Sequence, residues 1–213
     1  DGPWRSQGQP ISDGMGWSCC CCRVMRLIFL HGWGANAADL LPLGEALQAQ
    51  LPDGSETLQV QSWDAPDPHP AGGGARQWYD LNTPGWPQRP QAVRDLGARL
   101  DGELLAAGSE PVALFGFSQG AAMAIEVGLS RPLAAVIACS GYPHPDWSLS
   151  KAPQAPVLLL HGSDDLVVPV AAQAALAAEI SRVGGQVEVL TFAGGHTIPL
   201  EAVERAANFL AAR

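Results

Sequence analysis

Two hydrophobic patterns alternate along the chain from residue 24 onward. Short, continuous apolar runs predict strands that are buried on both faces, which is typical of a parallel sheet. These runs lie at residues 24–30, 58–63, 111–117, 134–139, 156–160 and 186–192. Between them, apolar residues recur three or four positions apart, which predicts amphipathic helices. The helical segments are residues 38–50, 91–107, 119–129, 170–183 and 199–210.

The regular alternation of strand and helix predicts a doubly wound α/β fold with right-handed crossovers. The segment 64–90 breaks this order, because it is rich in Pro, Gly, Trp and Tyr and has no period. A loop of that length within a compact domain is usually functional or mobile. The pattern contains no internal repeat and no linker, so we expect residues 24–213 to form a single domain.

Composition and charge disfavour nucleic-acid-binding and membrane-spanning proteins. The chain has 213 residues, of which 47% are hydrophobic, and its formal net charge is −9. An acidic surface disfavours binding to nucleic acid or to an anionic membrane. No apolar run reaches the roughly 18 residues needed to span a bilayer, so stable membrane insertion is not expected.

The first 23 residues follow neither pattern and contain the run Cys19-Cys20-Cys21-Cys22. Four adjacent thiols suit a tetrahedral zinc site poorly, because metal-binding cysteines are normally spaced. Lipidation is a second interpretation, but the next residues enter a core strand. We expect residues 1–23 to be a disordered extension, and the natural start to be Met15 or Met25. The segment lacks the pattern of a signal peptide, which favours a cytoplasmic location.

The strongest chemical signal is Gly116-Phe117-Ser118-Gln119-Gly120. A G-x-S-x-G match alone is weak, but this one lies between a predicted buried strand and a predicted helix. A serine on such a sharp turn is exposed at the carboxyl edge of the sheet, and glycines are needed where a Cβ would collide with neighbouring backbone. We therefore expect Ser118 to be a nucleophile.

A serine nucleophile needs an adjacent general base. Of the five histidines, His31 and His161 follow apolar runs and are interpreted as structural. His69 and His144 lie in proline-rich loops, where we expect contact with solvent. His196 follows the last predicted strand and a Gly-Gly pair that can present its imidazole over the sheet edge, so it is the predicted base.

The base needs a carboxylate to hold its tautomer. Asp164 and Asp165 both follow the predicted strand 156–160. The order Ser, Asp, His along the chain is the one that α/β hydrolases have. Spacing alone does not choose between the two aspartates.

With these motifs in this order, the chain resembles the phospholipase/carboxylesterase family of α/β hydrolases, which includes acyl-protein thioesterases and small bacterial esterases. The resemblance rests on five stretches in the family's order. They are Leu30-His31-Gly32-Trp33-Gly34, Trp78-Tyr79-Asp80, Gly116 through Met123, His161-Gly162 through Pro169, and Gly194-Gly195-His196. It implies an α/β-hydrolase fold with a mostly parallel sheet of about six or seven strands.

The resemblance also implies roles for individual residues. Ser118 matches the nucleophile and His196 the base, and the family's aspartate falls on Asp165. The oxyanion hole falls on the backbone N–H groups of Trp33 and Gln119. The aromatic residues Trp33, Trp78, Tyr79 and Trp86 are candidates for contact with substrate, although they could instead pack as ordinary core.

The expected activity is hydrolysis of carboxylic esters or thioesters by acyl transfer, without a metal or an organic cofactor. The expected substrate is a small or lipid-like acyl ester. A lysophospholipase or an acyl-protein thioesterase on the same fold is the main alternative. A peptidase and a non-catalytic ligand-binding protein are further alternatives. The sequence predicts neither the acyl length, nor the leaving group, nor the oligomeric state.

Overall fold

A single six-stranded sheet organises the part of the chain that the structure, a computed structural model, describes, which is residues 24–213. Its strands are β1 (Val24–Leu30), β2 (Thr57–Trp63), β5 (Val112–Phe117), β6 (Ala135–Cys139), β7 (Val157–Gly162) and β8 (Val187–Phe192). They lie in the order β2-β1-β5-β6-β7-β8, and every neighbouring pair is parallel. The predicted α/β-hydrolase architecture is confirmed, with six strands.

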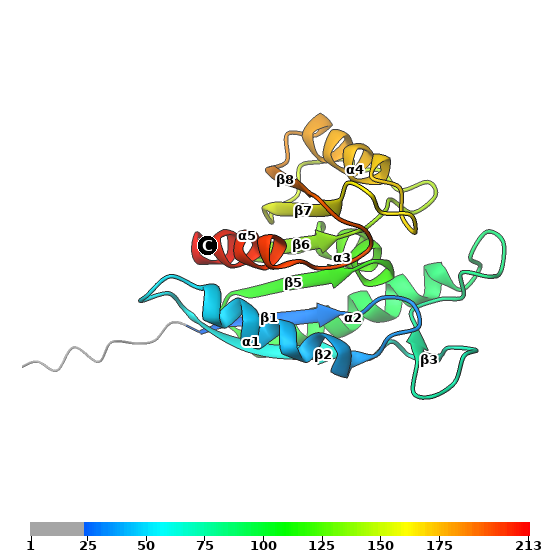
Figure 1. The fold of residues 1–213 in the computed structure, drawn as a ribbon, viewed down its shortest axis with the longest axis horizontal. Helices are drawn as coiled ribbons and strands as arrows, with labels where there is room; N and C mark the ends of the chain where they lie inside the picture. Colours follow the sequence, from blue (N-terminus) through cyan, green and yellow to red (C-terminus); the bar gives the residue numbers. More distant parts are fainter. Residues whose placement is uncertain (1–23) are drawn as a thin grey trace, which may run out of the picture.

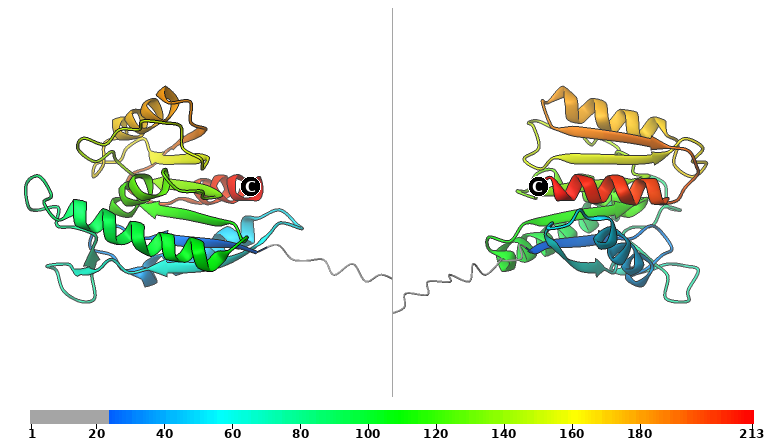
Figure 2. Two further views of the ribbon diagram at one scale, coloured as in Figure 1. Left: turned by 180° about the vertical axis from the view of Figure 1, so that it is seen from behind. Right: turned by 60° about the vertical axis from the view of Figure 1, so that its left-hand side comes forward.

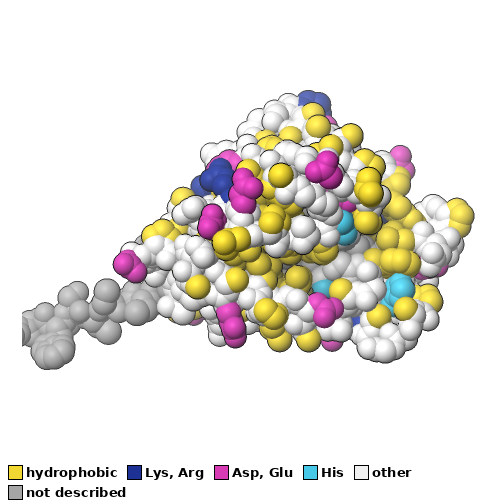
Figure 3. All heavy atoms as spheres, in the orientation of Figure 1, with side chains coloured by type: hydrophobic (Ala, Val, Ile, Leu, Met, Phe, Trp, Pro, Cys, Tyr) yellow, Lys and Arg dark blue, Asp and Glu magenta, His cyan; other side chains and the backbone are white. Residues whose placement is uncertain are grey.

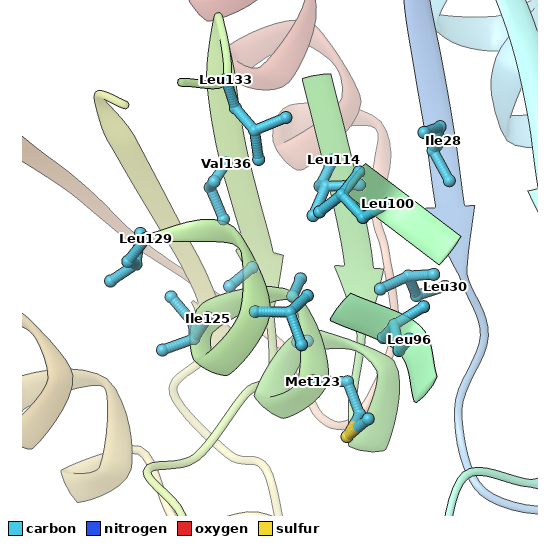
Figure 4. Close-up of a cluster of buried hydrophobic side chains, with 14 of the residues drawn as sticks. Ile28, Leu30, Leu96, Leu100, Leu114, Met123, Ile125, Leu129, Leu133 and Val136 are labelled. Atoms are coloured by element: carbon cyan, nitrogen blue, oxygen red, sulfur yellow. The ribbon is translucent and has the colours of Figure 1, made fainter. Parts of the chain in front are cut away.

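Helices cover both faces of the sheet (Figures 1 and 2). They are α1 (Leu41–Gln50), α2 (Arg89–Ala107), α3 (Gln119–Gly128), α4 (Ala171–Arg182) and α5 (Leu200–Ala211). Helices α1 and α5 pack on one face, where Leu47 and Phe209 join one apolar cluster. The other three share a second cluster on the opposite face, which Figure 4 shows around Leu100 and Met123.

Burial explains why the apolar runs are continuous. Every residue of β6 and β7 is buried, because these strands lie inside the sheet between helices on both faces. In the edge strands β2 and β8, only the last residues, Trp63 and Phe192, are buried, and the others are partly buried or exposed. The strongest sequence signals therefore come from the middle of the sheet.

Two local features differ from the sequence-based expectation. The segment 64–90 contains a two-stranded antiparallel ribbon of β3 (Asp67–Pro68) and β4 (Arg76–Gln77), whose strands are too short to leave a periodic pattern. The predicted helix 38–50 is divided into a 3-10 turn (Ala37–Leu40) and α1. Pro42 lies in the first turn of α1, where its missing N–H suits the start of a helix better than its interior.

The expectations for residues 1–23, including the cysteine run Cys19–Cys22, lie outside the described residues. Within residues 24–213, no helix is both long and apolar enough to cross a bilayer.

Candidate active site

The carboxyl ends of the parallel strands bring the predicted site residues to one edge of the sheet. Trp33 follows β1, Ser118 follows β5, Asp165 follows β7 and His196 follows β8. A pocket of about 430 Å³ lies at this edge. Its lining residues are Trp33, Leu81, Trp86, Ser118, Tyr142, Val167, Val168, Pro169, Ala172 and His196. On the face shown in Figure 3, hydrophobic and histidine side chains gather on the side toward which the strands of Figure 1 run.

Ser118 occupies a strained turn between β5 and α3. Its backbone has φ 54° and ψ −118°, a left-handed region that non-glycine residues rarely adopt. A Cβ at Gly116 would overlap the backbone of α3, and one at Gly120 would overlap the Leu30 carbonyl of β1. Both glycines are thus required by close backbone approach, as the motif predicts.

His196 and Asp165 form a hydrogen-bonded pair at this edge. His196 Nδ1 lies 2.7 Å from Asp165 Oδ2, and the Asp165 side chain is fully buried. The other carboxylate oxygen, Oδ1, accepts the backbone N–H groups of Val167 and Val168, each at 2.9 Å. Since an ionised carboxylate only accepts, Nδ1 carries the proton of this bond, and Nε2 of a neutral ring is left as an acceptor.

The hydrogen bonds at Asp165 decide its charge state. Burial raises the pKa of Asp165, but the bonds from His196, Val168 and Val167 outweigh burial and leave the pKa below its usual range. Asp165 is therefore a carboxylate at neutral pH. The adjacent Asp164 is exposed, and its side chain accepts the Ser163 hydroxyl instead.

The loop that carries His196 is held against the end of β7 by backbone contacts. Asp164 N–H donates to Gly194 O at 2.8 Å, and Ser163 N–H donates to Phe192 O at 2.9 Å. A Cβ at Gly162 would overlap the carbonyl oxygens of Gly194 and Gly195. This close approach places the His196 loop next to Asp165.

Ser118 and His196 line the same pocket, but no hydrogen bond joins their side chains within the described residues. The His196 ring packs against Phe117, with ring centroids 4.9 Å apart. Catalytic hydrogen bonds are often long in unliganded sites and tighten when substrate binds.

Two backbone donors near Ser118 are unused. Within the part of the chain that the structure describes, neither the Trp33 N–H nor the Gln119 N–H donates a hydrogen bond. Gln119 begins α3, where the helix dipole also favours negative charge. The Trp33 indole N–H is occupied, because it donates to Gln77 Oε1 at 2.9 Å.

The four aromatic candidates divide into two pairs. Trp33 and Trp86 line the pocket, whereas Trp78 and Tyr79 are buried in the core and do not line it. The Gln119 side chain holds the latter two, accepting Trp78 N–H at 3.0 Å and donating to Tyr79 O at 2.8 Å. Contact of Trp78 and Tyr79 with substrate therefore stays a prediction from the sequence, and in the structure these side chains lie behind the pocket.

The remaining histidines hold loops. His31 Nε2 accepts Ala65 N–H, and His161 Nε2 donates to Val168 O, next to Asp165. The expected solvent contact of His144 is wrong, because this side chain is buried and hydrogen-bonded at both ring nitrogens. His69 is half-buried against the Trp33 ring.

No group of three or more His, Cys, Asp or Glu side chains within residues 24–213 is placed to hold a metal ion. Sequence reasoning missed several residues that line the pocket, namely Leu81, Tyr142, Val167, Val168, Pro169 and Ala172. All six lie in loops or at a helix start, where no periodic pattern marks them. For Tyr142 and for residues 167–169, a position in the loop after a predicted strand was the one available signal.

The fold is that of a known hydrolase family. The family model described as phospholipase/carboxylesterase matches residues 24–213, and the chain belongs to this family.

Solved structures with the same fold include several esterases. The structure of esterase PE8 is 29% identical, with 89% of this chain and 91% of that chain covered and a TM-score of 0.72. The carboxylesterase from Mesorhizobium loti is 19% identical, with 89% of both chains covered and a TM-score of 0.74. SOBER1 of Arabidopsis thaliana is 24% identical, with 88% of this chain and 97% of that chain covered and a TM-score of 0.72. The last two likenesses concern the fold alone.

Proposed function

We propose that the protein is a serine carboxylesterase in which Ser118 is the nucleophile, His196 the general base and Asp165 the carboxylate that orients the base. The observation that carries the proposal is the 2.7 Å bond between His196 Nδ1 and the buried Asp165, in the wall of a pocket that also holds Ser118. Membership of the phospholipase/carboxylesterase family supports the same reaction class.

The proposed reaction is acyl transfer in two halves. Ser118 Oγ forms a bond to the substrate carbonyl carbon while its proton passes to His196 Nε2, and the carbonyl electron pair moves onto oxygen. When that pair returns, the bond to the alcohol or thiol breaks, and the leaving group takes the proton from His196. Water then repeats both steps, which releases the carboxylic acid and restores Ser118.

The reaction develops a negative charge on the carbonyl oxygen and a positive charge on His196, and other groups would stabilise these charges. The oxyanion would be stabilised by the free N–H groups of Trp33 and Gln119, and each such donor is worth about 3 kcal/mol. The Asp165 carboxylate would stabilise the imidazolium that forms on His196. Besides Ser118, His196, Tyr142 and two indole N–H groups, the described lining is nonpolar, which suits the acyl chain of an ester or thioester. A cytoplasmic location stays a prediction from the sequence.

Incubation with a fluorophosphonate tests the proposed nucleophile. We expect a single adduct, mapped to Ser118 by peptide mass spectrometry, because these reagents react with activated serines. Absence of an adduct on folded protein would contradict the proposal.

A Ser118→Ala variant tests the reaction itself. We expect hydrolysis of para-nitrophenyl esters to fall at least roughly 1,000-fold while the variant keeps its fold, because only the attacking oxygen is removed. Circular dichroism provides the folding control. A folded variant that hydrolyses esters at the wild-type rate would overturn the mechanism.

A further inference from the structure

A second pairing of histidine with carboxylate lies beside the pocket and is not used by the proposed reaction. His144 Nδ1 lies 2.7 Å from Glu126 Oε2, and His144 Nε2 lies 2.7 Å from the Tyr79 hydroxyl. The Tyr79 hydroxyl in turn lies 2.8 Å from the Tyr142 hydroxyl. The result is a hydrogen-bonded chain from Glu126 on α3 to Tyr142, which lines the pocket.

For the neutral form of the buried His144 ring, the chemistry of the four groups sets the direction of every bond. The Glu126 carboxylate only accepts, so His144 donates from Nδ1, and Nε2 of the neutral ring must accept. The single Tyr79 proton therefore points to His144. Tyr142 must then donate its own proton to the Tyr79 oxygen.

Both phenols keep their protons at neutral pH. Burial raises the pKa of Tyr142 to about 12, and burial raises the pKa of Tyr79 still further. With its proton directed to Tyr79, the Tyr142 oxygen is left with lone pairs and no free proton. It can only accept a hydrogen bond from a molecule in the pocket.

The Tyr142 hydroxyl lies among mostly nonpolar groups. Its ring is half-buried and packs against Trp86, with ring centroids 5.8 Å apart. Among the described lining residues, the only polar side-chain groups besides those of Ser118 and His196 are the Tyr142 hydroxyl and the indole N–H groups of Trp33 and Trp86. An indole N–H only donates, and that of Trp33 already donates to Gln77. Tyr142 is therefore the one of these three groups that can accept a hydrogen bond from a non-reacting part of a substrate.

We propose that Tyr142 is a specificity-determining residue that accepts a hydrogen bond from the substrate, so that the enzyme favours esters carrying a hydroxyl group away from the scissile bond. The inference rests on the proposed esterase function and names the substrate class of the same site. A site built to pair with a donor discriminates against an analogue that lacks it, because the buried acceptor is then left unpaired.

The test compares pairs of isomeric esters in which only one member can donate a hydrogen bond. The probes are para-nitrophenyl esters of ω-hydroxyhexanoate and ω-hydroxydecanoate, each paired with the isomer whose chain ends in a methoxy group. A second series places the hydroxyl or methoxy group on the alcohol side of a butyrate ester. In at least one series we expect kcat/KM of the wild-type enzyme to favour the hydroxyl member by roughly 3- to 10-fold.

Tyr142→Phe removes the acceptor and should bring this ratio close to unity. Leu81→Ala is the matched control, because it changes another lining residue without touching the hydrogen-bonded chain, and it should keep the ratio whatever its effect on absolute rates. A wild-type ratio near unity in both series, or an unchanged ratio in Tyr142→Phe, would overturn the inference.

Tyr79→Phe tests the direction of the chain. Without the Tyr79 oxygen, the Tyr142 proton is free to turn toward the pocket, so discrimination against the methoxy ester should weaken while Tyr142 is still present. An unchanged ratio in a folded Tyr79→Phe variant would contradict the assigned direction. Failure of the esterase proposal itself has a different signature, since the wild-type enzyme would then hydrolyse no ester and form no fluorophosphonate adduct.

Discussion

The two adjacent aspartates after β7 have the same chemistry but very different surroundings. The Asp165 side chain is fully buried and receives three hydrogen bonds, whereas Asp164 is exposed and accepts one from its neighbour Ser163. Both have the same chemistry and lie one position apart. Only Asp165 contacts His196.

The pair provides a matched test of the orienting carboxylate. Asp165→Asn preserves the shape of the side chain but removes its charge and can favour the wrong tautomer of His196, so kcat should fall by roughly 1,000- to 10,000-fold. Asp164→Asn should stay near the wild-type rate in the same ester assay. Equal losses in the two variants would contradict the assignment.

Individual site residues were predictable to different degrees. Ser118 and His196 follow from local sequence, because a strand-to-helix turn and a Gly-Gly turn mark them. Spacing left Asp164 and Asp165 open, and the family resemblance indicated Asp165. The chain from Glu126 to Tyr142 was not predictable, because its partners lie 18 and 65 residues from His144 and no motif links them.

At the scale of elements, the hydrophobic pattern predicted all six strands of the main sheet and all five helices to within about two residues at most ends. The inner strands are the clearest, because helices bury both of their faces. The pattern could not predict β3 and β4, because two residues are too few to show a period of two.

Helix α4 is tied to the loop that follows β6 by two charged side chains. Glu179 pairs with Arg182 at 2.7 Å, and it also accepts the Leu149 N–H at 2.6 Å. Arg182 donates to the Leu149 carbonyl in return. The hydrogen bonds from Arg182, and then from Leu149, lower the pKa of Glu179 to about 2.

The depressed pKa predicts an acid-dependent contribution to stability. Since the pKa is lower in the folded state than the ordinary value of 4.5, the stabilisation is complete above about pH 4.5 and is lost as the pH falls toward about 2. Glu179→Gln should therefore lower the Tm at pH 7, and the difference from the wild type should shrink at pH 3. A difference in Tm that is independent of pH would contradict this linkage.

At the scale of the whole molecule, the site depends on backbone segments far apart in sequence that meet at one sheet edge. The end of β7 and the Gly194-Gly195 turn touch through backbone alone, and Gly162 makes that approach sterically allowed. The geometry of His196 and Asp165 thus depends on a residue that has no chemistry of its own.

Gly162→Ala should separate these segments. We expect kcat/KM for esters to fall by roughly 10- to 100-fold, because small displacements of catalytic groups are costly. Gly102→Ala is the control, since Gly102 lies within α2 with open space around it, and alanine there should leave activity unchanged and favour the helix. Equal activity of the two variants would show that the close approach is not needed.

The Gln119 side chain joins the start of α3 to the loop at Trp78 and Tyr79. This contact slows the exchange of one amide proton with solvent. The Trp78 amide proton is bonded to a fully buried Gln119 carbonyl oxygen, so deuterium can replace it only when the loop and the helix separate. The exchange rate at that single amide therefore reports how often the structure behind Ser118 opens, even when nothing is bound or turned over.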